Sequence, residues 1–556
     1  MSPNTSQRSQ RYSHRALVAL AITITWSTVW FWRSDITSNV YNSAPDHPAP
    51  PVLTSPDHPD TPQNEGGEQD PPAEPTTATG TEQPPSPPPP SPASADFLPP
   101  EYLTLPEDQQ QCEDIFGNSY IRNIAGTVQE SCAAGSPSEL HCFFGQRLRN
   151  RWVPWERDPL CLAQGVRFAP SSGASAFSPG YSGAEFEMQC EAQNFDRDLM
   201  GDYWGGTGVG NTFKTWKFMS EQQDGSSTGM SGCSKENSTD DWIVLVRREI
   251  SDQHNIWHQL MQISQARHTI DALRTAINPD TGRPWLSAAD AARVQVVLDD
   301  DRHHALEDLW RIAGGGGAPI RASDLAPGTC YGNVIVPMPG SSSPFWSALI
   351  GDLRQDCRGR QTLLDTFVAR VLAHYGVEPR APSEIHEYPT ITIVDRAENR
   401  KFINLDARVD ALRVRHPSSR ISVVDFAALT FAEQLRLVQD TDVLVGHHGA
   451  AMTHTLFMAP GAAAVEVLPP YFLQRGFRAL GRMRGLAYFT GRGMWEEEYR
   501  NVTRGEPLPE GWSPPREHEG WKEREWAYML DEDFLGLVDA AVRSQLNRLN
   551  DDERAV

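Results

Sequence analysis

The chain has 556 residues, enough for two or more domains, and a formal net charge of -23 at pH 7. So acidic a chain repels nucleic acid, which excludes nucleic acid as a partner. An anionic small ligand would need a local basic site to bind against this overall charge.

The N-terminal hundred residues contain no predicted folded domain. Residues 16–32 form an apolar run near the lower length limit for a membrane span, and Arg8, Arg11 and Arg15 precede it. This basic excess predicts a cytoplasmic tail at 1–15, a signal anchor at 16–32 and translocation of the rest. A cleaved signal peptide is the alternative, but no small-x-small site follows directly.

Residues 33–100 are rich in proline and polar residues, which predicts a disordered stem. A disordered tail without a spacer role is the alternative. All eight cysteines follow this segment, at positions 112, 132, 142, 161, 190, 233, 330 and 357. They form no Cys-x-x-Cys pair, and their even number in a translocated region predicts disulfides. Cys330 with Cys357 is the expected local pair.

Residues 101–240 are rich in cysteine, glycine and aromatic residues and show no clear period, which predicts irregular, disulfide-tied structure. From residue 241 the pattern sharpens. A first alternating series, residues 241–385, has predicted strands at 242–246, 294–298 and 333–336 and predicted helices at 254–276 and 301–312. Asp299, Asp300 and Asp301 follow its second strand directly.

A second alternating series occupies residues 386–500. It has predicted strands at 391–394, 421–424, 443–445 and 464–467 and predicted helices at 406–415 and 431–439. Such series form parallel sheets covered on both faces, so we expect an α/β fold with two Rossmann-like domains facing a cleft. In the C-terminal extension, 501–556, residues 525–549 are expected to form a helix that returns to the first domain.

Basic residues follow the first strand of the second series. Arg396 and Arg400 come after Val394, and Asn404 lies four residues further on. A guanidinium matches the geometry of phosphate oxygens and stays charged at any relevant pH. Arginines after a strand are more often only a solvated turn, so this pattern alone leaves both readings open.

The strand at 443–445 runs into Gly446-His447-His448-Gly449-Ala450. A turn of this kind opens a helix whose free amides and positive dipole end favour an anion. Gly449 lets a ligand approach the backbone, and His448 can donate to a phosphate or sugar oxygen. The alternative makes His448 a turn residue bonded to a carbonyl, and His447 is expected to be structural. Glu466, at the end of the next strand, either holds ribose hydroxyls or is a plain strand-end carboxylate.

At these residues the chain resembles the family 61 glycosyltransferases. The family pattern is a strand, Gly-x-His-Gly-Ala, a Thr-Asn pair, Leu-Phe, Pro-Gly and a strand carrying Glu. The matching residues are Gly446, His448, Gly449, Ala450, Thr453, Leu456, Phe457, Pro460, Gly461 and Glu466. His454 stands where the family usually has Asn, and Ala451 and Met452 replace a Gly-Leu pair. Arg396, Arg400 and Asn404 resemble a second family element, and Asn255 to His258 resembles the family's Asn-x-x-His.

The resemblance implies the GT-B architecture and a UDP-sugar donor, with N-acetylglucosamine or xylose as the expected sugar. The donor-binding residues it implies are Arg396, Arg400, Asn404, His448, Gly449, Ala450 and Glu466. His258 is the expected general base or acceptor-orienting group, with His254 and Glu249 in reserve. We expect an inverting transferase of the Golgi or endoplasmic reticulum that needs no metal or other cofactor and uses a glycoprotein or glycan acceptor.

Two alternatives remain open. Asp299 to Asp301 superficially match the Asp-x-Asp element that binds a manganese-nucleotide in the other architecture, GT-A. The departures at Ala451 and His454 also allow a lumenal binding protein that keeps the fold without transferring sugar.

Overall fold

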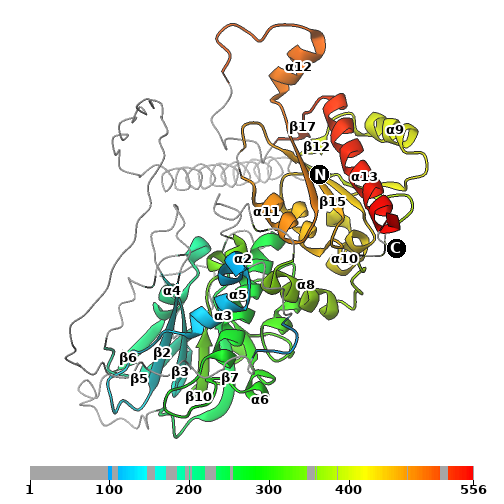
Figure 1. Ribbon diagram of the computed structural model, residues 1–556. Helices are drawn as coiled ribbons and strands as arrows, with labels where there is room; N and C mark the ends of the chain where they lie inside the picture. The colour runs from blue at the N-terminus through cyan, green and yellow to red at the C-terminus, as the bar shows by residue number, and fades with distance from the viewer. Residues whose placement is uncertain are drawn as a thin grey trace, which may run out of the picture. The chain divides into compact units, whose positions relative to one another are not determined.

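The computed structural model describes much of the chain from residue 98 onward, and all of these residues belong to one compact unit, Pro89–Val556 (Figure 1). The described ranges are 98–102, 110–146, 157–170, 184–193, 200, 203–219, 233–250, 254–346, 357, 360–382, 384, 386–472, 474–513 and 524–554. The expected cytoplasmic tail, membrane anchor and nearly all of the stem lie outside them. Within these ranges, no helix combines the length and the apolar character that crossing a bilayer requires.

The larger sheet has ten strands. They are β1 (Val128–Glu130), β2 (Glu139–Gln146), β3 (Arg157–Gln164), β4 (Val166–Pro170), β5 (Ala184–Gln189), β6 (Trp216–Met219), β7 (Thr239–Val246), β8 (Gln295–Leu298), β9 (Ile320–Arg321) and β10 (Cys330–Val336). β7 pairs in parallel with β10 and β8, and β8 pairs in parallel with β9. The predicted strands of the first series are confirmed as β7, β8 and β10, which lie in this parallel part of the sheet.

Residues 101–240 differ from the expectation of irregular structure. They supply β1 to β6 and the start of β7, and β3 and β4 pair antiparallel with β10. α2 (Gln110–Phe116) and α3 (Asn118–Ala125) add Phe116 and Ile121 to the core beneath the parallel strands. The expected domain boundary at residue 241 therefore falls inside this sheet.

Short helices and one long helix accompany the first sheet. They are η4 (Trp204–Gly206), α4 (Val209–Phe213), α5 (Ile256–Thr275), α6 (Ala288–Ala291), η6 (Asp308–Ala313), η7 (Ala322–Asp324), η8 (Gly340–Ser342) and α8 (Thr362–His374). α5 confirms the helix predicted at 254–276. The helix predicted at 301–312 was wrong in extent, since only the 3-10 turn η6 forms. The Asp300 carboxylate accepts from the Arg302 amide at 2.9 Å, which sets a side-chain turn in place of a helical start.

The smaller main sheet has five parallel strands in the order β13-β11-β14-β15-β16. The strands are β11 (Ile391–Val394), β13 (Ile421–Val424), β14 (Val443–His447), β15 (Ala463–Leu468) and β16 (Ala487–Arg492). A separate pair joins β12 (Lys401–Phe402) to β17 (Trp526–Ala527). The four strands predicted for the second series are confirmed, and β16 was missed.

Helices cover both faces of this smaller sheet (Figure 1). They are α9 (Leu405–Arg415), η10 (Phe426–Ala428), α10 (Phe431–Gln439), η11 (Ala450–Phe457), α11 (Gly476–Met483) and α13 (Asp531–Arg554). A further helix, α12 (Glu496–Arg504), has no buried residue and projects away from the sheet (Figure 1). Alternate strand residues serve the two faces: Val443 and Val445 pack in one cluster with α9 and α13, whereas Leu444 packs in another with α10 and α11.

The C-terminal helix α13 does not return to the first sheet as expected. Phe534, Val538 and Val542 lie buried in the cluster that contains Ile391 and Val465 of the second sheet. Two ion pairs fix this position: Arg408 to Asp531 at 2.7 Å and Arg415 to Asp539 at 2.5 Å, and His416 Nε2 lies 2.8 Å from Asp539. α13 therefore completes the second α/β layer.

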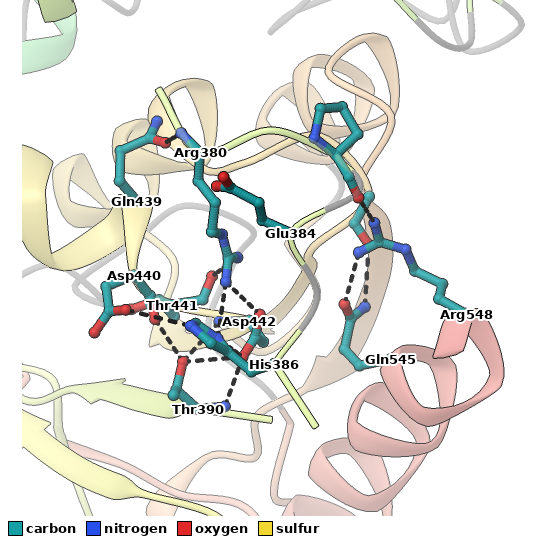
Figure 2. A network of polar contacts seen from close by, with 12 residues as sticks. Arg380, Glu384, His386, Thr390, Gln439, Asp440, Thr441, Asp442, Gln545 and Arg548 are labelled. Carbon is teal, nitrogen blue, oxygen red and sulfur yellow. Dashed lines mark hydrogen bonds and ion pairs between the residues drawn. The ribbon is translucent and has the colours of Figure 1, made fainter. Parts of the chain in front are cut away.

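A polar network fixes the segment that leads into this second layer (Figure 2). The buried Asp442, just before β14, accepts from Arg380 at 2.8 Å and from the Thr390 amide at 2.8 Å, and its carboxylate lies 2.6 Å from His386 Nδ1. Arg548 of α13 donates to the Pro382 carbonyl at 2.8 Å. The network thus holds the start of β14, the end opposite His447.

Three disulfides join described cysteines: Cys132 with Cys190, Cys142 with Cys161, and Cys233 with Cys330. Cys357 is also disulfide-bonded. The expected Cys330–Cys357 pair was wrong, because β10 places Cys330 beside Cys233, which is remote in sequence but has a Cα 5.6 Å away.

Acid is expected to destabilise this fold through its buried histidines. Burial lowers the pKa of His268 to about 3, with Arg370 and Arg267 acting in the same direction and Asp271 opposing them. The imidazole of His268 therefore takes up a proton near pH 6.5 in the unfolded chain but not in the folded one. The free energy of unfolding falls as the pH drops from about 6.5 toward 4, and this residue contributes about 3 kcal/mol at most to the fall.

His268→Gln should flatten that slope in urea unfolding measured between pH 7 and pH 4, whatever its effect on stability at neutral pH. His303→Gln is the matched control, because the His303 side chain is 92% exposed. Equal slopes for the two variants would contradict the assignment.

Candidate active site

Arg396 and Arg400 lie in the loop between β11 and β12, beyond the carboxyl end of β11. Arg400 adopts a left-handed backbone with φ 58°, and its Nη1 donates to the His448 carbonyl at 3.1 Å. Arg396 is half-buried, and burial lowers the pKa of its guanidinium. Within the described ranges no hydrogen bond from that guanidinium to a protein acceptor is found, so Arg396 is available to an anion.

Gly449 follows β14 at the closest approach to Arg400. Its φ is 152°, and a Cβ at this position would lie only 2.6 Å from Arg400 Nη1. A side chain here would therefore displace the arginine. Ala450 then begins η11, so the predicted helix after the glycine is a 3-10 helix.

His448 belongs to a buried polar chain. Its Nδ1 lies 2.7 Å from Glu466 Oε1, and Tyr488 donates its hydroxyl proton to Glu466 Oε2 at 3.0 Å. The side chains of His448 and Glu466 are 8% and 2% exposed. The carboxylate acceptor assigns a proton to Nδ1.

Glu466 differs from the expectation of a strand-end carboxylate facing a ligand. β15 continues to Leu468, which places Glu466 inside the strand and beneath His448. The structure thus brings His448, Gly449, Arg400 and Glu466 together. Asn404 is not part of this cluster: it is exposed and donates to the Tyr499 hydroxyl at 3.1 Å.

The two other histidines of this region are neutral; His454 is buried and His447 is partly exposed. Burial lowers the pKa of His447 to about 3, with His448, Arg400 and Arg396 adding to the effect, and His447 Nδ1 donates to the His448 carbonyl at 3.1 Å. Burial also lowers the pKa of His454, to about 4. His454 packs between Phe426 and Phe431, away from the arginine loop. His454, which replaces the Asn of the family pattern, therefore lies in the core and away from the candidate site.

His258 lies near the start of α5, which Asn255 caps by accepting from the Trp257 amide. Its Nδ1 is 2.6 Å from Oε2 of Glu249, whose side chain is fully buried, and the His258 side chain is 12% exposed. Trp346 packs edge-on against the imidazole, with centroids 4.6 Å apart. A buried carboxylate thus fixes the ring and its tautomer, leaving Nε2 to take a proton.

Aromatic rings connect this pair to the second sheet. Phe477 of α11 packs against Trp257 at 5.6 Å and against His448 at 5.4 Å. Trp257 is the direct neighbour of His258. His258, the candidate base, and His448, the candidate donor contact, therefore lie next to the same aromatic cluster, one from the side of each sheet.

Two of the three consecutive aspartates make ion pairs inside the protein. Asp300 is buried and accepts two hydrogen bonds from Arg248, at 2.6 and 2.9 Å, while Asp299 lies 3.5 Å from Arg247. These arginines, at the end of β7, neutralise the carboxylates that a GT-A reading would assign to a metal. Only Asp301 is exposed.

Sequence reasoning missed Tyr488 and Phe477, and it noted Glu249 only as a reserve base. No local pattern marks Tyr488 or Phe477, since β16 becomes a neighbour of β15, and α11 of η11 and β16, only in the folded protein. Glu249 had a weak signal, as a carboxylate just beyond a buried strand.

Removing the Tyr488 hydroxyl tests the buried chain. Tyr488→Phe leaves Glu466 Oε2 without its donor, so the free energy of unfolding should fall by about 1–3 kcal/mol. Urea unfolding measures the change. Tyr375→Phe is the control, since the Tyr375 hydroxyl donates to the exposed Asp308; comparable losses in both variants would contradict a special role for Tyr488.

Comparison with known proteins agrees with the resemblance to the family 61 glycosyltransferases. Residues 269–465 match the family model described as Glycosyltransferase 61. The chain is 40% identical over 133 residues to the EGF domain-specific O-linked N-acetylglucosamine transferase of Mus musculus, which covers 23% of this chain and 24% of the relative. The protein of the same name from Xenopus laevis is 34% identical over 145 residues, 25% of this chain and 26% of the relative. The alignments thus span about a quarter of these relatives' length.

Proposed function

The chain carries a glycosyltransferase family 61 region at residues 269–465, and we propose that it transfers a sugar from a UDP-sugar to an acceptor hydroxyl. The observation that carries the proposal is the meeting of Arg400, His448 and Gly449 at the carboxyl ends of parallel strands. Ligands of open α/β sheets bind at such strand ends. The two sheets, with His258 at the end of β7 in the first and His448 after β14 in the second, support the GT-B architecture.

In this proposal the donor diphosphate lies against the loop after β11. Arg396 and Arg400 bind its oxygens, His448 Nε2 accepts from a sugar hydroxyl, and the glycine backbone admits the ligand closely. Glu466 and Tyr488 position His448 from below. Ala450 contributes the start of η11, and Asn404, by its contact with Tyr499, acts at most on the rim.

Transfer then requires a base on the other side of the donor. His258 Nε2 accepts the acceptor hydroxyl proton while Glu249 stabilises the resulting imidazolium. The acceptor oxygen forms a bond to the anomeric carbon, and the bond from that carbon to the phosphate oxygen breaks, with UDP leaving as the anion. Attack opposite the leaving group inverts the anomeric centre. Arg396 and Arg400 stabilise the charge that develops on UDP.

The sugar and the compartment are further parts of the proposal. The names of the relatives favour N-acetylglucosamine over xylose as the sugar. The disulfides suit the lumen of the Golgi or endoplasmic reticulum, with a glycoprotein or glycan as acceptor and residues 16–32 as the anchor. The ion pairs of Asp299 and Asp300 support metal independence.

Thermal shift with UDP tests the donor site of the full chain. UDP at about 100 times its Kd should stabilise the fold by about 2.7 kcal/mol, whereas ADP at the same concentration should do less. A screen of nucleotide-sugars, measuring UDP release with and without EDTA, then tests transfer. No shift at millimolar UDP contradicts the proposal, and a shift without turnover favours the non-catalytic binding protein.

A further inference from the structure

A glycine-rich turn presents one exposed tryptophan beside the candidate base. Trp204 is 45% exposed, although its neighbour Tyr203 is 6% exposed and Thr207 only 1%. Gly205, Gly206 and Gly208 have φ values of 68°, 75° and 99°. These left-handed backbones favour glycine and give the turn its shape.

The turn rests directly on the dyad formed by Glu249 and His258. A Cβ on Gly205 would lie 2.9 Å from Glu249 Cβ, which is too close for any side chain. The Trp204 ring lies beside that of His258, with centroids 6.4 Å apart and planes at 52°. An acceptor whose hydroxyl reaches His258 therefore passes along the indole.

The carbonyl groups of this turn are already used. Trp204 O accepts from the Thr207 hydroxyl at 2.8 Å, Gly205 O from the Ile250 amide at 3.2 Å and Gly206 O from Arg247 Nε at 3.3 Å. These bonds fix the turn, since each of the three carbonyl oxygens already accepts a hydrogen bond within the protein. The indole of Trp204 is exposed beside them.

We propose that Trp204 is an acceptor platform on which a pyranose ring of a glycan acceptor stacks, with a ring hydroxyl directed at His258. The inference rests on the proposed function. The C–H bonds on one face of a pyranose carry partial positive charge, which suits the negative face of an indole. A flat ring also needs no backbone partner, in agreement with the occupied carbonyls. Trp204 lies outside the family match at 269–465.

Binding measured without turnover tests the platform. The probes are xylobiose, N,N′-diacetylchitobiose and an unglycosylated Ser/Thr peptide, each added to the full chain with UDP and followed by saturation-transfer NMR. We expect at least one disaccharide to bind, Trp204→Ala to weaken it about 10-fold, and Trp204→Phe to restore most of the affinity. Tyr388→Ala is the control, because Tyr388 is a 52% exposed aromatic residue outside this site.

Each outcome decides the matter. Loss of disaccharide binding in Trp204→Ala, with the control unchanged, supports the platform. Absence of disaccharide binding to the wild type, equal affinity in Trp204→Ala, or loss of peptide binding only, overturns it. Failure of the proposed function is seen separately, as the absence of a UDP thermal shift in the wild type.

Discussion

His258→Ala is expected to lower kcat for sugar transfer by about 10²–10⁴-fold while UDP binding is kept, because the acceptor hydroxyl then loses its proposed base. Glu249→Gln should have a smaller effect of the same kind, since the amide can still contact Nδ1 but no longer stabilises a charged imidazole. Transfer is measured at saturating donor and acceptor, and UDP binding by thermal shift.

His254→Ala is the matched comparison for this base. His254 lies four residues earlier, is exposed, and has no contact with Glu249 among those found in the described ranges. If His254→Ala removes transfer and His258→Ala does not, the reserve candidate is the base. If neither does, proton transfer must be sought elsewhere.

Arg400→Ala and Arg396→Ala are each expected to weaken UDP binding about 10–100-fold, the effect of losing a charge-assisted contact to the diphosphate. Arg396 should show the clearer effect, because its half-buried guanidinium has a pKa lowered by burial and a bound phosphate offsets that cost. Arg396→Lys keeps the charge without the fork, so it should restore affinity only in part.

Calorimetric titration with UDP measures these affinities, and Arg413→Ala is the control. Arg413 is a surface arginine of α9, paired with Asp410 and 60% exposed. Equal affinity in the Arg396 and Arg413 variants would remove Arg396 from the site, and a salt-dependent loss in all variants would indicate only general charge attraction.

The second α/β layer was predictable from sequence because its strands are short, continuous apolar runs separated by helices. Residues 391–394, 421–424 and 443–445 each lie within one strand, and α10 occupies the residues predicted for it. Local pattern also located the arginine loop and the glycine turn, because both directly follow such strands.

The antiparallel strands of the first sheet were not predictable in this way. β10 pairs with β3, so that Val334 lies opposite Ala163, and such remote pairing has no local signature. The same reason explains the wrong cysteine pair and the wrong position of α13. The apolar face of α13, which includes Phe534 and Val538, indicates that the helix packs on another apolar surface. The sequence of the helix does not say which of the two sheets provides that surface.

The site was predictable only as far as residue types following strands. Contacts between strands decided the rest: Glu466 became a support for His448 because Tyr488 stands beside it on β16. Glu249 gained its role because α5 brings His258 to the end of β7. Both carboxylates accept a hydrogen bond from Nδ1 of a histidine that is distant in sequence or on another element, and such a contact can be recognised only in the folded protein.

The position of α13 has a consequence for biosynthesis. Strands β11 to β16 are complete at Arg492, but the face that carries Val443 and Val445 is covered by a helix that begins only at Asp531. During synthesis, the second α/β layer therefore keeps an apolar face exposed until this helix has been made. This exposed apolar face is the surface that chaperones are expected to bind. A premature stop before Asp531 should yield a chain that is retained and degraded.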